Sequence, residues 1–277
     1  MPKSFDHCMD LVYQSDRDRF LTTLFAPAAA RPHLFALYAF NIEIARIRET
    51  VSEPLPGEIR LQWWRDFLTN TAPGDAAAHP VAMELGKAIE TYDLPVSALT
   101  RMIDARVFDL YNDPMPTLND LEGYAGDTAS ALFQLSGWIL DTHEARAITE
   151  AAGHGGVAYA ITMLLKALPQ HAARHQLFIP GDIIKKHHAD PNDIFSGNMT
   201  APLAEVLAEL RSLAREHLEA FKATKLPQSA RPPFLLLSLT ERYLRLMEKL
   251  RPNPFEEPVE IPQWRRQWTL WRASRRS

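Results

Sequence analysis

The stretch Leu34-Phe-Ala-Leu-Tyr-Ala-Phe-Asn-Ile-Glu-Ile-Ala-Arg-Ile-Arg-Glu49 is the part of the chain that indicates the fold. Its first seven residues are all apolar or aromatic, and its later apolar residues recur at intervals of three and four, which is the period of an α-helix. We therefore predict a helix over about residues 30–50. One face of that helix combines two apolar and two charged side chains, those of Ile42, Ala45, Arg46 and Glu49.

The same helical period covers most of the remaining chain. Between residues 203 and 221 the apolar side chains form one stripe, with charged residues between them. Comparable patterns run over about residues 57–70, 80–92, 96–110, 118–140, 145–168 and 232–250. Clusters of proline, glycine and aspartate separate these segments, and no alternating pattern of strand length stands out. We predict an all-α single domain over residues 1–250, followed by a proline-rich linker and a tail over 251–277.

Composition and charge exclude several classes of protein. The chain has 277 residues, 46% of them hydrophobic, a net charge of −4 and one cysteine. This apolar content argues against disorder, and one cysteine cannot form an internal disulfide or a thiolate zinc site. The negative net charge argues against nucleic acid as a partner. No apolar run approaches the roughly 18 residues of a membrane span, and the first residues lack a leader pattern. We expect a cytoplasmic protein that could lie on the inner face of a membrane.

Three segments in order carry a family resemblance. The first is the helix quoted above, the second is Leu121-Glu-Gly-Tyr124 followed by Ala129-Ser-Ala131, and the third runs from Val157 to Leu168 and leads to Phe178-Ile-Pro180. In this order and spacing the chain resembles the squalene/phytoene synthase family, all-α enzymes that join two prenyl diphosphates head to head. The resemblance covers about residues 4–255. It implies an isoprenoid-synthase-like helical bundle with a central apolar cavity.

The chain departs from this family at the positions that hold its metal ions. Family members bind Mg²⁺ through aspartate-rich motifs on two facing helices, because ionising an allylic diphosphate requires hard oxygen ligands around Mg²⁺. The resemblance aligns the first motif with Ala45, Arg46 and Glu49, which leaves one acid and adds a cation that would repel a metal. It aligns the second with positions that carry no carboxylate, among them Ala167, Gln170 and His171. We therefore predict no metal site, no cofactor and a catalytically degenerate protein.

Within the family, the resemblance is greatest to the branch of the mitochondrial complex I assembly factor and its bacterial relatives. The shared features are Phe40-Asn-x-Glu-x-Ala45 and the run from Pro169 to His175, in which the proline should end or kink the second motif's helix. The resemblance implies membrane-associated assembly or maintenance of a respiratory complex, with its subunits as partners. The alternative hypothesis is an active prenyl diphosphate transferase that uses Mg²⁺ with Glu49 and other ligands.

Positive charge near the expected cavity suggests a second hypothesis for binding. Arg46, Arg48 and Lys166, together with Glu49 and Tyr124, could surround the head group of a prenyl or other anionic lipid without a metal. The simpler interpretation is an Arg46–Glu49 pair at i, i+3, with the other two cations exposed at helix surfaces.

Two further clusters of polar residues are interpreted as structural. Asp109 and Asp113 have the i, i+4 spacing of a carboxylate pair, but Pro114 follows at once and indicates a helix end. Four histidines fall between residues 171 and 188, and without a carboxylate partner they are best interpreted as a polar surface loop.

The end of the chain has a composition of its own. Residues 264–277 contain three of the six tryptophans, five arginines and no acid. Trp264, Trp268 and Trp271 lie on one face of a predicted helix, and Arg265 and Arg272 flank them. Aromatic side chains at head-group depth with adjacent cations are typical of a helix at a membrane surface that contains anionic lipid. The alternative is that the tryptophans fold back on the bundle and the arginines are solvated.

Overall fold

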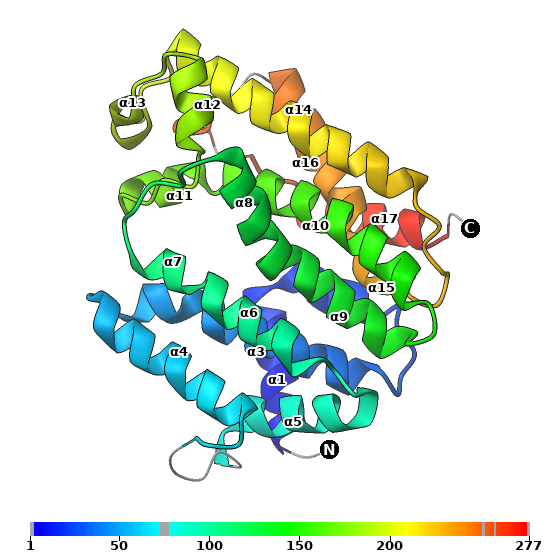
Figure 1. Ribbon diagram of the computed structural model, residues 1–277. Coiled ribbons are helices and arrows are strands. Elements are labelled where there is room, and N and C mark those ends of the chain that lie inside the picture. Colours follow the sequence, from blue (N-terminus) through cyan, green and yellow to red (C-terminus); the bar gives the residue numbers. More distant parts are fainter. Residues whose placement is uncertain (1–2, 73–77, 251–252, 258, 276–277) are drawn as a thin grey trace.

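The structure is a computed structural model that describes residues 3–72, 78–250, 253–257 and 259–275. In these residues the chain is helical and contains no strand, which confirms the predicted all-α class. The helices stack into two groups around two clusters of buried apolar residues (Figure 1). No helix in these ranges is both long and apolar enough to cross a bilayer.

The first group of helices surrounds the stretch of sequence that indicated the fold. Every residue from Leu34 to Phe40 is at most 2% exposed, so this part of α3 is buried on all sides. Helix α3 packs against α1, α5 and α9. The helices of this group are α1 (Lys3–Ser15), α2 (Arg17–Thr23), α3 (Arg31–Thr50), α4 (Pro54–Leu68), α5 (Pro80–Tyr92), α6 (Val96–Ala105) and α7 (Val107–Leu110).

The second group is built around α10, which contacts α9, α14 and α16 and a π-helical turn, η2. In Figure 1 this group lies above the first, with α14 along its outer side. Its elements are α8 (Leu118–Ala125), η2 (Gly126–Ser130), α9 (Ala131–Leu140), α10 (Ala145–Lys166), α11 (Leu168–Ala173), α12 (Gly181–Lys186), α13 (Pro191–Ser196), α14 (Ala201–Ala223), α15 (Arg231–Phe234), α16 (Leu236–Leu250) and α17 (Gln263–Ser274).

Several predicted helices are divided in the structure. Helix α10 ends at Lys166, and Pro169 lies in the first turn of the short α11, as the missing amide hydrogen of a proline requires. The segment predicted over 96–110 breaks at Arg106, and the one over 118–140 contains η2. Helices α1, α2, α11, α12 and α13 were not predicted from the sequence. Four of them have only six or seven residues, too few to show a clear apolar period, whereas α1 has 13 residues and was missed.

The tail does not project from the bundle. Helix α17 contacts α16 and α2, and its Leu270 is only 1% exposed. Figure 1 shows it beside the second group of helices. Residues 263–274 are therefore part of the packed body of the protein.

Candidate functional site

The first motif's one acid is Glu49, and it lies between two arginines at the end of α3. Its Oε1 accepts a hydrogen bond of 2.9 Å from Nη1 of Arg174, which follows α11. Its Oε2 lies 3.9 Å from Nε of Arg46, the i, i+3 pair of the simpler interpretation. Arg46 also donates to Oγ of Ser15 at 3.0 Å. A Mg²⁺ ion at Glu49 would have to approach two guanidinium groups, so these residues do not fit a magnesium site.

The other expected cations contact different partners. Nη1 of Arg48 donates to the backbone carbonyl of Val51 at 3.3 Å. Nζ of Lys166 lies 3.0 Å from Oε1 of Glu260 and 5.0 Å from the centre of the Tyr243 ring. The hypothesis that Arg46, Arg48 and Lys166 surround one anion is therefore not supported by their contacts.

The second motif's positions lie where α10 gives way to α11. Ala167 is the residue between the two helices, and the Gln170 side chain is exposed. His171 packs on Phe178, with 4.7 Å between ring centres. Burial, with a smaller contribution from Arg174, lowers the pKa of His171 from 6.5 to about 4. Its interpretation as part of a polar surface loop is wrong, because α11 turns this histidine toward the apolar core.

The lowered pKa of His171 predicts a loss of stability in acid. Between pH 6.5 and about 4 the unfolded chain binds a proton at this residue that the folded chain does not bind, so the free energy of unfolding falls as the pH falls through this range. His171→Leu should show a smaller fall between pH 7 and pH 4.5 in urea titrations. If the free energy of unfolding falls as steeply with pH in the variant as in the wild type, His171 does not account for the acid sensitivity.

The matched control is the same replacement at the exposed His143, which should leave the pH dependence as it is in the wild type. Burial raises the pKa of Glu43 to about 7, which gives the opposite trend, since its contribution is lost as the pH rises. Glu43 is present in the wild type and in both histidine variants, so a comparison of the three isolates the contribution of His171 to the pH dependence.

A buried polar cluster that the sequence analysis missed connects α7 with α8. Nη1 of Arg106 donates to Oδ2 of Asp109 at 3.0 Å and to the Tyr124 hydroxyl at 2.7 Å. That hydroxyl donates to Oδ1 of Asp109 at 2.8 Å, and Nε2 of Gln176 donates to the Asp109 backbone carbonyl at 3.0 Å. Burial raises the pKa of Asp109, and the Arg106 charge opposes that rise. Tyr124, predicted to line a ligand pocket, is instead engaged in this cluster.

A second buried cation lies between the two motif helices. The Arg19 side chain from α2 is stacked 5.8 Å from the centre of the Tyr38 ring on α3 and 5.0 Å from that of Tyr159 on α10. It also pairs with Asp16. Burial raises the pKa of both tyrosines to about 12. Only the spacing of Asp16 and Arg19 could have indicated this cluster from the sequence, because its tyrosines come from distant helices.

An apolar pocket where α8, α10, α11 and α14 meet has a volume of about 10 Å³, roughly the space of one water molecule. This pocket is far too small for a prenyl chain. A larger open groove of about 520 Å³ lies beside α3 and α4, and both Arg46 and Glu43 line it.

The tail helix combines features of the two hypotheses made for it, a helix at a membrane surface and a helix that packs on the bundle. Its helix packs on the bundle through Leu270 and through Arg266, whose Nε donates to Oδ1 of Asp18 at 2.9 Å. The three tryptophans point away from that contact and are exposed by 64%, 56% and 43% at Trp264, Trp268 and Trp271. The arginines of the tail are therefore not all solvated, and its tryptophans do not fold back on the bundle.

Comparisons with known proteins agree with this architecture. The family described as squalene/phytoene synthase matches residues 12–272. The rat protein named NADH dehydrogenase (ubiquinone) complex I, assembly factor 6, is 32% identical over 252 residues, which is 90% of this chain and 75% of the rat protein. The phytoene synthase of Synechococcus elongatus is 21% identical over 98% of this chain and 92% of its own.

Among solved structures, a dehydrosqualene synthase in complex with a ligand superposes with a TM-score of 0.81 over 98% of this chain and 95% of that chain. The two sequences are 16% identical, so this likeness concerns the fold. The extent of the family match and the identity to the rat protein decide membership: the chain belongs to the squalene/phytoene synthase family.

Proposed function

We propose that this protein does not catalyse prenyl transfer and instead supports the assembly of a respiratory NADH dehydrogenase. The observation that supports the absence of prenyl transfer is the contact between Glu49 and Arg174. The one carboxylate kept at the motif positions is neutralised by a guanidinium, with Arg46 on its other side. Diphosphate ionisation needs a carboxylate that is available to Mg²⁺. The site as built favours a structural role for Glu49, tying α3 to the segment after α11.

The assembly role is supported by the names of the relatives. The proteins of rat and human that are 32% identical to this chain are both named as assembly factor 6 of complex I. The phytoene synthase of Synechococcus elongatus, at 21% identity, is more distant. Respiratory-complex subunits are therefore the proposed partners. The proposed location is cytoplasmic, peripheral on the inner face of the membrane, which the exposed tryptophans of α17 support.

An enzyme assay tests the non-catalytic part. Incubation with farnesyl or geranylgeranyl diphosphate and Mg²⁺ should release no diphosphate and form no condensed hydrocarbon, while a known dehydrosqualene or phytoene synthase, which needs no reductant, does both under the same conditions. Because Glu49 is engaged by Arg174, Glu49→Ala should leave this result unchanged. Turnover by the wild type that disappears in Glu49→Ala would overturn the proposal.

A genetic experiment tests the assembly part. Deletion of the gene in its own host should lower the amount of assembled NADH dehydrogenase on native gels and its quinone reductase activity. The wild-type gene and Glu49→Ala should restore both, since the proposed role does not use the carboxylate for catalysis. An unchanged amount of the complex in the deletion strain would contradict the role in assembly.

A further inference from the structure

An open groove of about 700 Å³ runs between α16 and α17. This is the size of a pocket for a small ligand or a lipid head group. Its walls come from the end of α14, from α16 and from the tail helix, which meet in Figure 1 on the same side of the molecule. The charged side chains that line it are those of Lys222, Glu241, Arg242, Arg245 and Arg272. The groove therefore carries four cations and one acid.

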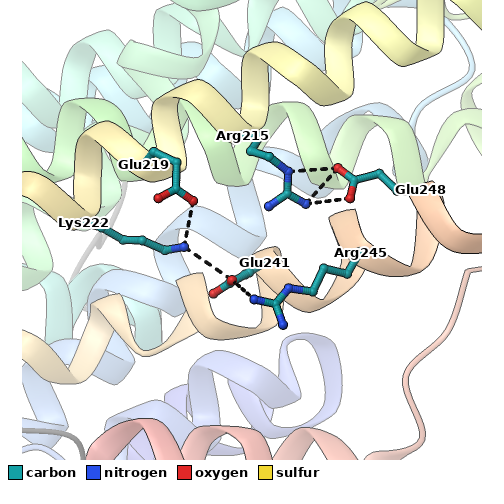
Figure 2. Close-up of polar contacts among 6 residues, drawn as sticks. All are labelled: Arg215, Glu219, Lys222, Glu241, Arg245 and Glu248. Carbon is teal, nitrogen blue, oxygen red and sulfur yellow. Dashed lines mark hydrogen bonds and ion pairs between the residues drawn. The ribbon is translucent and has the colours of Figure 1, made fainter.

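Part of this positive charge is already compensated. Figure 2 shows Glu241 of α16 between Lys222 and Arg245. Its Oε1 lies 3.4 Å from Nζ of Lys222 and is also hydrogen-bonded to Arg245. Lys222 is further paired with Glu219 at 2.9 Å. These contacts hold the two cations at the wall of the groove and reduce their attraction for an anion.

The other two cations of the groove, Arg242 and Arg272, carry positive charge that is not compensated. Nη1 of Arg242 is 3.4 Å from the Thr269 hydroxyl of α17, which orients the side chain without neutralising it. Arg272 is exposed one turn after Trp268. Within the described part of the chain, neither arginine belongs to an ion pair. A guanidinium binds phosphate oxygens through paired N–H groups, so two of them in one groove are suited to a phosphate group.

The groove continues into the exposed tryptophan face of α17. Trp268 lines the groove and stacks on Trp271, with 5.0 Å between ring centres. At the start of the helix, the guanidinium of Arg265 lies 5.0 Å from the centre of the Trp264 ring. Tryptophan side chains prefer the head-group depth of a membrane, where their apolar rings are buried and their N–H groups stay hydrated. A phosphate held in the groove would lie beside Trp268.

We propose that the groove between α16 and α17 binds the phosphate of an anionic phospholipid, with Arg242 and Arg272 on the phosphate and the tryptophans of α17 in the interface. The inference rests on the membrane location in the proposed function and names the lipid class. A lipid is favoured over a soluble phosphate because the tryptophan face adjoins the cations. It is favoured over nucleic acid because the chain as a whole is acidic, with a net charge of −4.

Vesicle sedimentation tests the proposal with the full-length protein. The wild type should bind vesicles of phosphatidylcholine mixed with phosphatidylglycerol and should bind phosphatidylcholine alone much more weakly. Each cation near an anionic surface strengthens binding about fivefold, so Arg242→Gln with Arg272→Gln should weaken binding roughly 25-fold. Truncation of the tail is a poor test, because it would uncover the core around Leu270.

Two further variants control for charge and folding. Arg242→Lys with Arg272→Lys keeps both charges and should retain most of the binding. Arg60→Gln with Lys185→Gln removes the same charge from exposed residues of α4 and α12, away from the groove, and should weaken binding less than about twofold. Thermal unfolding by circular dichroism shows whether each variant folds. Where the glutamine pair does not fold, Trp268→Ser replaces it and should also reduce binding.

The outcomes separate the two proposals. If the control pair weakens binding as much as the groove pair does, attraction is general and the groove assignment is overturned, while the membrane location remains. If the wild type binds no vesicle, both the groove and the membrane location are overturned, and the non-catalytic assignment is untouched. If inorganic phosphate without vesicles shifts the tryptophan fluorescence as vesicles do, the ligand is a soluble anion and the lipid assignment is wrong.

Discussion

Asp109→Leu is expected to lower the free energy of unfolding by about 3–5 kcal/mol, because it leaves the Arg106 guanidinium buried without its counter-ion. The two side chains of this pair are only 16% and 10% exposed, so water cannot replace the lost carboxylate. The variant also removes the acceptor of the Tyr124 hydroxyl. Urea unfolding followed by circular dichroism measures the effect.

The control is the double variant Arg106→Met with Asp109→Leu. It removes the charge along with its partner, so it should be more stable than Asp109→Leu alone. Only Tyr124 then keeps an unpaired hydroxyl in the cluster. If the double variant is less stable than the single one by the full effect of a second, independent loss, the pair is not coupled and the electrostatic explanation fails.

Gly156→Ala is the second change with a large expected effect, a loss of about 3 kcal/mol in the free energy of unfolding. A Cβ at this position of α10 would lie 2.4 Å from Cα and 2.5 Å from the backbone nitrogen of Ser130. Backbone atoms cannot rotate away as a side chain can. The methyl group must therefore push α10 and the π-helical turn apart, which disturbs the packing between them.

Gly153 of the same helix provides the matched control. A Cβ there would meet no atom within 4 Å, and the residue is exposed. Gly153→Ala should raise the free energy of unfolding by up to about 1 kcal/mol, because alanine favours the helix more than glycine does. Thermal and urea unfolding of both variants measure the difference. Equal effects at the two positions would show that close packing at Gly156 is not the cause.

The helices of this protein were predictable where their apolar period is long. The segment around the run from Leu34 to Phe40 was predicted as a helix, and α3 confirms it. That this run is buried on all sides is a finding of the structure. Pro169 marked the end of α10, since a proline cannot donate the hydrogen bond of a helix interior. The break at Arg106 was not predictable, because neither a proline nor a glycine marks it in the sequence.

The candidate site was predictable in part. The acid and the cation at Glu49 and Arg46 follow from the sequence, and so does their spacing of one helical turn. The partner Arg174 lies 125 residues away along the chain, so no local pattern could pair it with Glu49. The same holds for Arg19, whose two aromatic partners come from α3 and α10.

By itself the sequence determined the helical class, the family resemblance, the residue types at the motif positions and the tryptophan face of the tail, because these depend on residue identity and on the period of a single helix. Only the tertiary structure decided which charges far apart in the sequence meet and which charge pairs are buried. It set Arg174 against Glu49, buried Arg106 with Asp109, and fixed α17 on the bundle through Arg266 and Asp18 with its tryptophans outward. These arrangements depend on how separate helices pack, and the strength of each charge pair depends on the solvent that this packing excludes.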